Sequence, residues 1–172
     1  MRKVKLFIAS SLDCYIARSD GRVDWLFTDG DYGYAKFYDS IDTAIMGRKT
    51  YETALKFEEQ PYKDKKCYVF TRSPGERYRN VEFSSDVVGV TRDLVCSEGK
   101  KDIWLVGGAE INSILLDAGL VHEIIVAVHP TILGSGIPMF NKVKQADMKL
   151  LDLVRYDNGL LQMRYELLLL SC

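Results

Sequence analysis

The stretch Ile103-Trp104-Leu105-Val106-Gly107-Gly108-Ala109-Glu110-Ile111-Asn112 joins an apolar run to a helical pattern through two adjacent glycines. Residues 102–106 suit a buried strand, and 109–117 predict a helix that Gly119 ends. Glycine has no Cβ, so a ligand can approach the backbone closely, and a helix N-terminus offers unpaired N–H groups and a positive dipole end. The stretch is therefore a candidate diphosphate site, although a plain tight turn fits it equally well.

Strand-like and helix-like segments alternate along the 172 residues on either side of this stretch. The predicted strands are 4–10, 43–46, 66–70, 81–83, 102–106 and 123–129. The predicted helices are 34–40, 49–55, 86–96 (capped by Ser84 or Ser85) and 109–117. Asp157-Asn158-Gly159 predicts a hairpin between 148–156 and 160–168. The order predicts one three-layer α/β domain over residues 1–172, with a mostly parallel central sheet, helices on both faces and a C-terminal antiparallel hairpin.

The composition is that of an ordinary soluble domain, with 47% hydrophobic residues, 27% charged residues and a formal net charge of −1. This balance argues against a nucleic-acid or membrane partner, and no apolar run approaches the ~20 residues that span a bilayer. The four cysteines are scattered and there are only two histidines, so we expect no metal site. No signal-peptide pattern is present, which leads us to expect a cytoplasmic protein.

Two further loops at predicted strand ends suit phosphate binding. Gly47-Arg48-Lys49-Thr50 places two cations in a first helical turn, where the dipole disfavours them unless an anion is bound. Thr71-Arg72-Ser73 suits a phosphate monoester, such as the 2′-phosphate that distinguishes NADP from NAD. Ligands of parallel sheets sit beyond the carboxyl ends of the strands, so these loops and the diglycine form one candidate site. The alternatives are a solvated basic turn and a turn that merely contains an arginine.

The segment Ser11-Leu12-Asp13-Cys14-Tyr15-Ile16-Ala17 follows the first strand. Ile16 and Ala17 can present backbone groups and apolar contacts to a flat ring. Asp13 is a weak catalytic candidate, and a structural turn is the favoured interpretation of the segment.

Carboxylates and aromatic residues gather before the first predicted helix. Asp24 and Asp29-Gly30-Asp31 lie close in sequence to Trp25, Tyr34 and Phe37. A carboxylate among such rings can hold or protonate a nitrogen heterocycle, so Asp29 and Asp31 are weak catalytic candidates and the three aromatic residues are candidates for substrate binding. A solvated acidic loop is the competing interpretation.

Two remaining features have structural interpretations. His122 and His129 lack triad partners and are expected to be structural. The stretch Gly134 to Phe140 is expected to be a turn-rich loop whose apolar end packs on a neighbouring subunit.

These motifs together resemble a known superfamily. Met46-Gly47-Arg48-Lys49-Thr50-Tyr51-Glu52 resembles the cofactor-binding motif of dihydrofolate reductases, and Val106-Gly107-Gly108-Ala109-Glu110 resembles their diglycine. The stretch from Trp104 through His122 to Gly136, together with Ser11 to Ala17, is similar to the C-terminal reductase domain of the bifunctional riboflavin-biosynthesis deaminase-reductase. The resemblance covers nearly the whole chain.

The resemblance implies a dihydrofolate-reductase-like fold, an NADPH cofactor, hydride transfer to a small-molecule substrate, and a homodimer. It places the nicotinamide at Ala9, Ile16 and Ala17, the phosphates and adenosine end at Gly47, Arg48, Lys49 and Thr50, the 2′-phosphate at Thr71, Arg72 and Ser73, and the pyrophosphate along Gly107, Gly108, Ala109 and Glu110.

The chain also departs from both enzymes. Cys14 stands where the family usually has glycine, and the helix beginning Tyr34-Ala35-Lys36-Phe37 lacks the carboxylate with which dihydrofolate reductases bind the pterin. Gly-Arg-Lys-Thr replaces the polar segment that holds ribosyl phosphate in the riboflavin enzyme. We therefore expect a reductase of the riboflavin-pathway pyrimidine first, dihydrofolate reductase second, and an NADPH-binding module without turnover as the alternative from another class.

Overall fold

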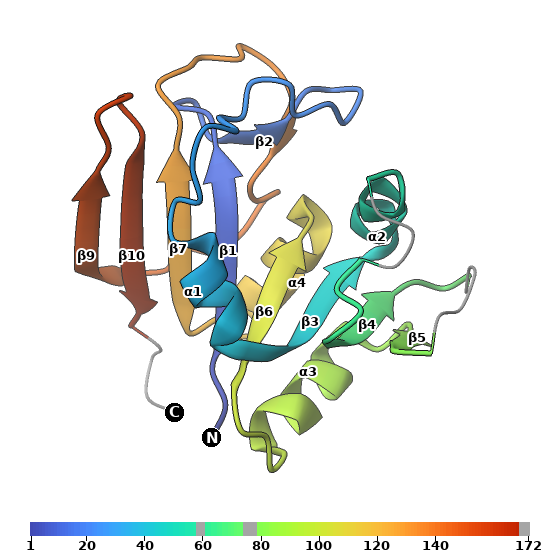
Figure 1. The fold of residues 1–172 in the computed structure, drawn as a ribbon. Coiled ribbons are helices and arrows are strands. Elements are labelled where there is room, and N and C mark those ends of the chain that lie inside the picture. Colours follow the sequence, from blue (N-terminus) through green and yellow to red (C-terminus); the bar gives the residue numbers. More distant parts are fainter. Residues whose placement is uncertain (58–60, 74–78, 169–172) are drawn as a thin grey trace.

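The computed structural model describes residues 1–57, 61–73 and 79–168 and confirms the expected alternation of strands and helices (Figure 1). The strands are β1 (Val4–Ser10), β2 (Tyr15–Ala17), β3 (Ile41–Gly47), β4 (Lys66–Phe70), β5 (Val81–Ser84), β6 (Asp102–Gly107), β7 (Glu123–Val128), β8 (Ile137–Pro138), β9 (Met148–Arg155) and β10 (Leu161–Leu167). The helices are α1 (Tyr34–Asp39), α2 (Arg48–Leu55), α3 (Val87–Cys96) and α4 (Ala109–Asp117).

The main sheet has the strand order β5-β4-β3-β6-β1-β7-β10-β9. All neighbours from β5 to β7 are parallel, whereas β10 runs antiparallel to both β7 and β9. The predicted hairpin is therefore confirmed, and its turn uses Gly159 at a φ of 87°, in the left-handed region that glycine tolerates. A second, antiparallel pair, β2 with β8, lies at the carboxyl end of β1.

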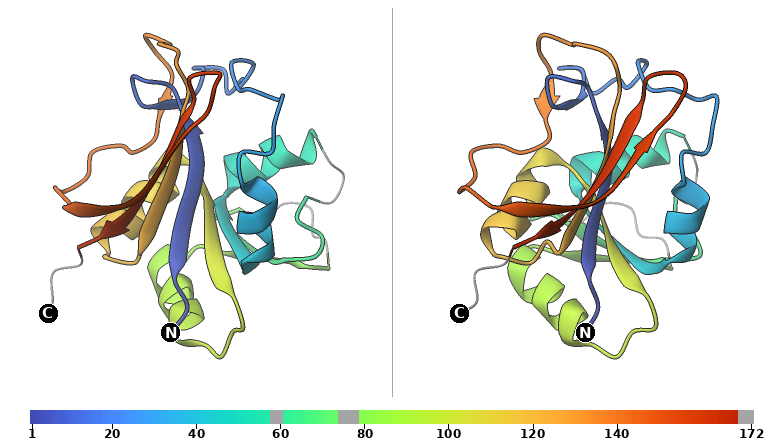
Figure 2. Two further views of the ribbon diagram at one scale, coloured as in Figure 1. Left: turned by 60° about the vertical axis from the view of Figure 1, so that its left-hand side comes forward. Right: turned by 90° about the vertical axis from the view of Figure 1, so that its left-hand side faces the viewer.

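The helices divide between the two faces of the sheet. Viewed edge-on, α3 and α4 lie on one side and α1 and α2 on the other, which makes three layers (Figure 2). Strand alternation explains the division, because successive side chains point to opposite faces. Leu6 and Leu105 pack under α3 and α4, while Trp104 packs with Phe37 of α1.

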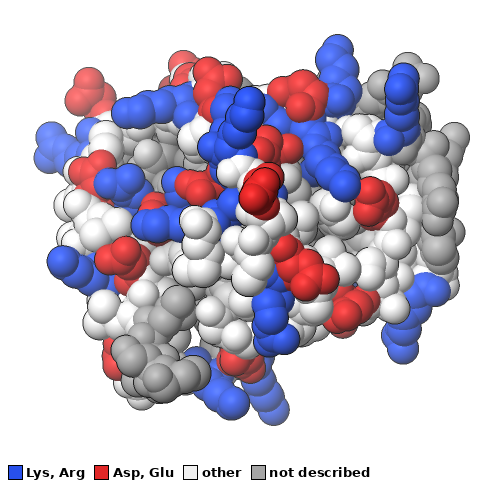
Figure 3. Space-filling view, turned by 90° about the horizontal axis from the view of Figure 1, so that it is seen from below, with Lys and Arg blue, Asp and Glu red and all other residues white. Residues whose placement is uncertain are grey.

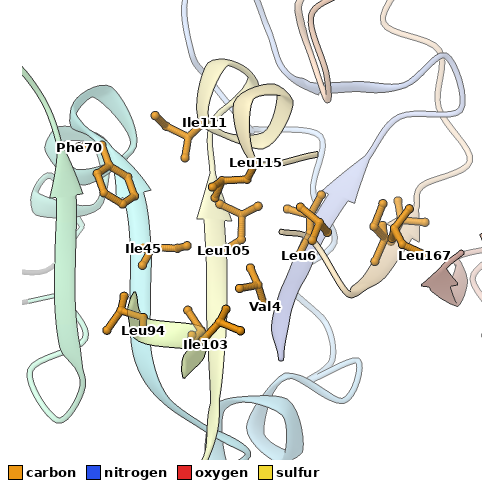
Figure 4. Packing of buried hydrophobic residues seen from close by; sticks show 14 residues of the cluster. Val4, Leu6, Ile45, Phe70, Leu94, Ile103, Leu105, Ile111, Leu115 and Leu167 are labelled. Atoms are coloured by element: carbon orange, nitrogen blue, oxygen red, sulfur yellow. The ribbon is translucent and has the colours of Figure 1, made fainter. Parts of the chain in front are cut away.

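The largest apolar cluster fills the space between the sheet and helices α3 and α4 (Figure 4). Leu6, Ile45 and Leu105 contribute from three strands, and Ile111 and Leu115 contribute from α4. Each such burial is worth about 1.5–3 kcal/mol relative to exposure. This packing anchors the first turns of α4, so the diglycine at its start has a rigid support.

Two local expectations are wrong. The cap of α3 is Asp86 rather than Ser84 or Ser85, because its Oδ1 accepts the Gly89 N–H at 2.8 Å. The segment Gly134 to Phe140 is not a loop throughout, since it contains β8, and its Met139 and Phe140 pack partly on the core of their own chain. The sequence of this segment has no strand-like alternation, and its pairing with β2 is a tertiary effect.

Charges of both signs are mixed on the face seen from below, at the amino ends of the parallel strands (Figure 3). No helix within the described parts of the chain is long and apolar enough to cross a bilayer.

Candidate functional site

The strand order brings the predicted loops together along one edge. β4, β3, β6 and β1 are consecutive neighbours and parallel, so their carboxyl ends meet there. In the register, Met46 is the partner of Gly107, and Gly47 is the partner of Phe70. The β3–α2 loop therefore lies between the β4 loop and the diglycine. Beyond the diglycine comes the loop after β1.

Glycines permit the close approach of α2 and α4 at this edge. A Cβ on Gly47 would lie 3.1 Å from Cγ1 of Ile111, and a Cβ on Gly108 would lie 3.3 Å from the Thr50 hydroxyl. Gly107 has a φ of 120°, which residues with a side chain rarely adopt, and its peptide bond to Gly108 is cis. The hydroxyl of Thr50 is thus placed beside the diglycine by steric fit.

Two helix N-termini converge here without side-chain caps. The N-cap residues are Gly47 for α2 and Gly108 for α4, and neither has a side chain that can accept the first N–H groups. Ala109 is buried at the start of α4, whereas Glu110 is exposed. Uncapped N–H groups of two converging helices form a positively polarised cradle suited to an anion.

The cationic residues of α2 reach toward the β4 loop. Arg48 pairs with Glu52 at 2.6 Å and donates from Nη1 to the carbonyl oxygen of Ser73 at 3.0 Å. Thr71 accepts the N–H of Ser73 at 3.1 Å, which bends the loop. The side chains of Lys49 and Arg72 are exposed. The two basic loops therefore form one continuous surface, and the residues after Ser73, 74–78, lie outside the described parts.

Asp13 connects the loop after β1 with the segment at Leu133 and Gly134 through hydrogen bonds. Its carboxylate accepts hydrogen bonds from the Ser11 hydroxyl at 2.6 Å and from the N–H groups of Leu133 and Gly134 at 3.1 and 2.8 Å. These bonds, the one from Ser11 foremost, lower the pKa of Asp13 from its ordinary value. An ionised carboxylate with three donors is a poor proton donor at neutral pH.

The residues that the resemblance assigns to the nicotinamide lie on either side of Asp13 in the sequence. Ala9 is near the end of β1, beside Ala127 of β7. Ile16 and Ala17 belong to β2, which pairs with β8. Ile16 and Ala17 therefore lie beyond the carboxyl end of β1 (Figure 1).

The three aromatic candidates fall into two groups. Phe37 stacks on Phe7 with ring centroids 4.4 Å apart and is buried, and Tyr34 packs edge-on against Trp104. Trp25 lies elsewhere, edge-on to His129 at 5.2 Å. Within the first group only Tyr34 offers substantial surface, at 38% exposure.

The acidic candidates before α1 are exposed. Asp24 pairs with Arg18 at 2.6 Å, and this arginine lowers the pKa of Asp24. Asp29 accepts a hydrogen bond from the Tyr32 hydroxyl, which lowers the pKa of Asp29. Asp31 accepts the Ala35 N–H at 3.0 Å at the start of α1. None of these three carboxylates lies in the apolar setting that the sequence suggested.

Sequence reasoning missed Asn112, a fully buried residue of α4. Its Nδ2 donates to the carbonyl oxygen of Met139 at 3.0 Å, and the Met139 N–H donates to the Cys14 carbonyl oxygen at 3.0 Å. Next to it, the Ser113 hydroxyl accepts the Asn141 N–H. Asn112 therefore joins the diglycine helix to the loop after β1. In the sequence, the polar pair Asn112-Ser113 within an otherwise apolar helix was the feature that could have indicated this role.

Comparisons with known proteins agree with the family and the fold. The family model of the RibD C-terminal domain matches residues 65–162. The uncharacterized Bacillus subtilis proteins YwjB and YyaP are 41% identical over 147 residues and 32% identical over 177 residues, covering 83% and 95% of this chain and 84% and 94% of their own. A candidate riboflavin biosynthesis protein from Shewanella sp. PV-4 superposes with a TM-score of 0.82 at 24% identity, covering 96% of this chain and 98% of its own. The expected dihydrofolate-reductase-like fold is thus confirmed.

Proposed function

Because the chain belongs to the RibD C-terminal domain family, which supports a reductase-like role, we propose that it is an NADPH-dependent reductase of a small heterocyclic substrate. One observation carries the proposal: two uncapped helix N-termini converge at the edge where four parallel strands end. Any side chain at Gly47 or Gly108 would enter this cradle or force its walls apart. The cradle is suited to the diphosphate of a dinucleotide.

The basic surface fits the adenosine end of the cofactor. The pyrophosphate would lie along Gly107 and Gly108, within reach of the Thr50 hydroxyl. Arg48 already ties the two basic loops together, which leaves the exposed Lys49 and Arg72 to meet phosphate oxygens. Arg72 between Thr71 and Ser73 would receive the 2′-phosphate and so favour NADPH over NADH.

The substrate would meet the nicotinamide near Ala9, Ile16 and Ala17. NADPH supplies the hydride, and the protein supplies orientation at the end of β1. Asp13 holds its proton weakly and is committed to three donors, so we assign it a supporting role. We infer that the proton comes from water.

The riboflavin-pathway pyrimidine, 5-amino-6-(5-phosphoribosylamino)uracil, is our first substrate. Dihydrofolate comes second because the first turn of α1 carries no acid, and Asp29 and Asp31 are exposed before it. The same lack of a placed acid keeps an NADPH-binding module without turnover as the alternative.

We further propose that the protein is a homodimer that uses β9. Every residue of this edge strand is exposed, including the apolar Leu150 at 49% and Leu153 at 54%. Soluble proteins normally cover or charge such an edge, and a second copy of the chain would cover it.

The test is a titration with NADPH and NADH that follows the fluorescence of Trp25 and Trp104. We expect Arg72→Ala to lose the preference for NADPH and Lys49→Ala to weaken both cofactors by roughly tenfold, the worth of one charge-assisted hydrogen bond. Arg92→Ala is the matched control, since Arg92 is an exposed arginine on α3, away from this edge. Failure of wild-type protein to bind either cofactor would refute the proposal. Binding without turnover of the pyrimidine or dihydrofolate would favour the binding module.

A further inference from the structure

The segment between β2 and α1 passes the end of β7 (Figure 1), and a buried histidine follows this strand in the sequence. His129 directly follows β7, is 4% exposed, and its N–H donates to the Ser10 carbonyl oxygen at 2.8 Å. Strand alternation puts Ile125, Ala127 and His129 on one face, and Ala127 is the register partner of Ala9. The imidazole therefore faces the α1 side of the sheet, as Ala9 does.

The imidazole forms a hydrogen bond with the backbone of the segment between β2 and α1. Its Nε2 accepts the Phe27 N–H at 3.2 Å, and its Nδ1 lies 3.2 Å from the Ala127 carbonyl oxygen. A ring nitrogen accepts only when it carries no proton, so Nδ1 must hold the proton and donate to Ala127. The arrangement requires a neutral ring in one tautomer. A second proton, on Nε2, would face the Phe27 N–H and break the bond.

Aromatic contacts complete the attachment. Trp25 meets the imidazole edge-on at 5.2 Å between centroids, and the Phe27 ring lies at 4.9 Å. The later part of the segment has its own anchor, because Gln162 of β10 donates to the Tyr32 carbonyl oxygen at 2.8 Å. The positions of Trp25 and Phe27 therefore depend on His129, whereas that of Tyr32 depends on the hairpin.

The surroundings of His129 favour the neutral ring. Trp25 and Phe27 cover the ring, its Nδ1 lies against the Ala127 carbonyl oxygen, and the backbone N–H of His129 donates to Ser10, so none of these contacts is charged. Asp24, the nearest carboxylate in sequence within the segment between β2 and α1, is exposed and paired with Arg18. Burial lowers the pKa of His129 below 6.5, and this effect outweighs the carbonyl groups of Ala127 and Ser10, which raise it.

We propose that His129 is a positioning residue that fastens Trp25 and Phe27 over the end of β1, on the face of Ala9, and releases them when its imidazole is protonated. The fastening itself follows from the contacts above. Its effect on catalysis rests on the proposed function, because the nicotinamide would meet the substrate on this face.

Amide hydrogen exchange tests the fastening without any cofactor. At pH 7.5 we expect His129→Leu to raise the exchange rate of the Phe27 N–H about fivefold, as the loss of one net hydrogen bond implies. His129→Gln retains an acceptor near the position of Nε2 and should restore most of the protection. Equal protection of Phe27 in wild type and His129→Leu would overturn the proposal.

Tryptophan fluorescence tests the release. Release would move the Trp25 indole from its packed contact with His129 toward water, so the emission maximum of wild type should shift to longer wavelength as the pH drops below 6.5. The transition should vanish in His129→Gln and in Trp25→Phe, because Trp104 packs against tyrosine and phenylalanine rings. A transition that persists in His129→Gln would overturn the proposal. Because it uses wild type, His129→Gln and Trp25→Phe, the fluorescence titration still tests the proposal if His129→Leu fails to fold.

A kinetic arm separates this proposal from the proposed function. With the substrate found by the turnover screen, His129→Leu should raise KM severalfold and leave the NADPH Kd unchanged. An unchanged KM would refute the catalytic role of the fastening. If the screen finds no substrate, the proposed function fails. The hydrogen-exchange and fluorescence measurements would still show whether His129 holds Trp25 and Phe27 in place.

Discussion

Gly47→Ala tests the steric account of the cradle. Gly47 has a φ of −78° and a ψ of 159°, which alanine adopts freely, so the backbone conformation does not oppose the substitution. The added Cβ would lie 3.1 Å from Cγ1 of Ile111, well inside the ~3.5–4.0 Å optimum for two carbons. Ile111 is 6% exposed and packs in the core. Overpacking of this kind costs ~1–3 kcal/mol, and the stiffer unfolded chain returns ~0.4–1 kcal/mol.

We therefore expect Gly47→Ala to lower the free energy of unfolding by about 1.3 kcal/mol, the difference between the midpoints of these two ranges. Urea unfolding followed by circular dichroism measures it. The sharper measurement is a double-mutant cycle with Ile111→Ala, which removes the clashing Cγ1. In that background the cost of Gly47→Ala should disappear. Gly30→Ala is a matched control, because the atoms nearest its Cβ would belong to the half-buried loop ring of Tyr32, at 3.3 Å, and not to the core.

The same variant tests the link to binding. Displacing Ile111 moves the start of α4 away from α2, so the NADPH Kd of Gly47→Ala should rise at least tenfold and recover partly in the double variant. An equal stability cost of Gly47→Ala with and without Ile111 would refute the steric reasoning. Unchanged NADPH affinity in a folded Gly47→Ala protein would refute the cradle.

Two more predictions concern acid stability and assembly. Burial lowers the pKa of His122 and of His129 below the unfolded value of 6.5, so their contribution to stability is complete above that pH and is lost as the pH falls below it. The free energy of unfolding in urea should therefore decrease from pH 7 to pH 5, and each His→Gln variant should show a smaller decrease; identical decreases in all three proteins would contradict this. Leu153→Lys should convert the proposed dimer to a monomer in light scattering, whereas Lys149→Ala on the same strand should not; a wild-type monomer would disprove the dimer outright.

Several elements were predictable because their signals are local. The strand 66–70 and the helix 109–117 have the predicted bounds, since a short apolar run and helical spacing ended by glycine depend on neighbouring residues alone. The cap of α3 shows where local signals compete. Serines and an aspartate are adjacent at 84–86, and only the backbone direction decides which side chain meets the Gly89 N–H.

Other features needed partners distant in sequence. Asp13 looked like an isolated carboxylate, but its donors at Leu133 and Gly134 come from the far end of the chain. Trp25 was grouped with Tyr34 and Phe37 by proximity in sequence, whereas the fold sends it to His129. β8 has no strand signal of its own and exists because β2 pairs with it.

The sequence by itself determined the fold class and the chemistry of the loops, because apolar periodicity, glycines and cations express their preferences over a few residues. Only the tertiary structure decided which loops meet, since β3 lies between β4 and β6 through packing against α3 and α4. It also decided which polar groups are committed to structural bonds, as Asp13, Asn112 and His129 are. Burial and hydrogen bonding depend on surroundings that the whole chain assembles, and no short stretch of sequence contains them.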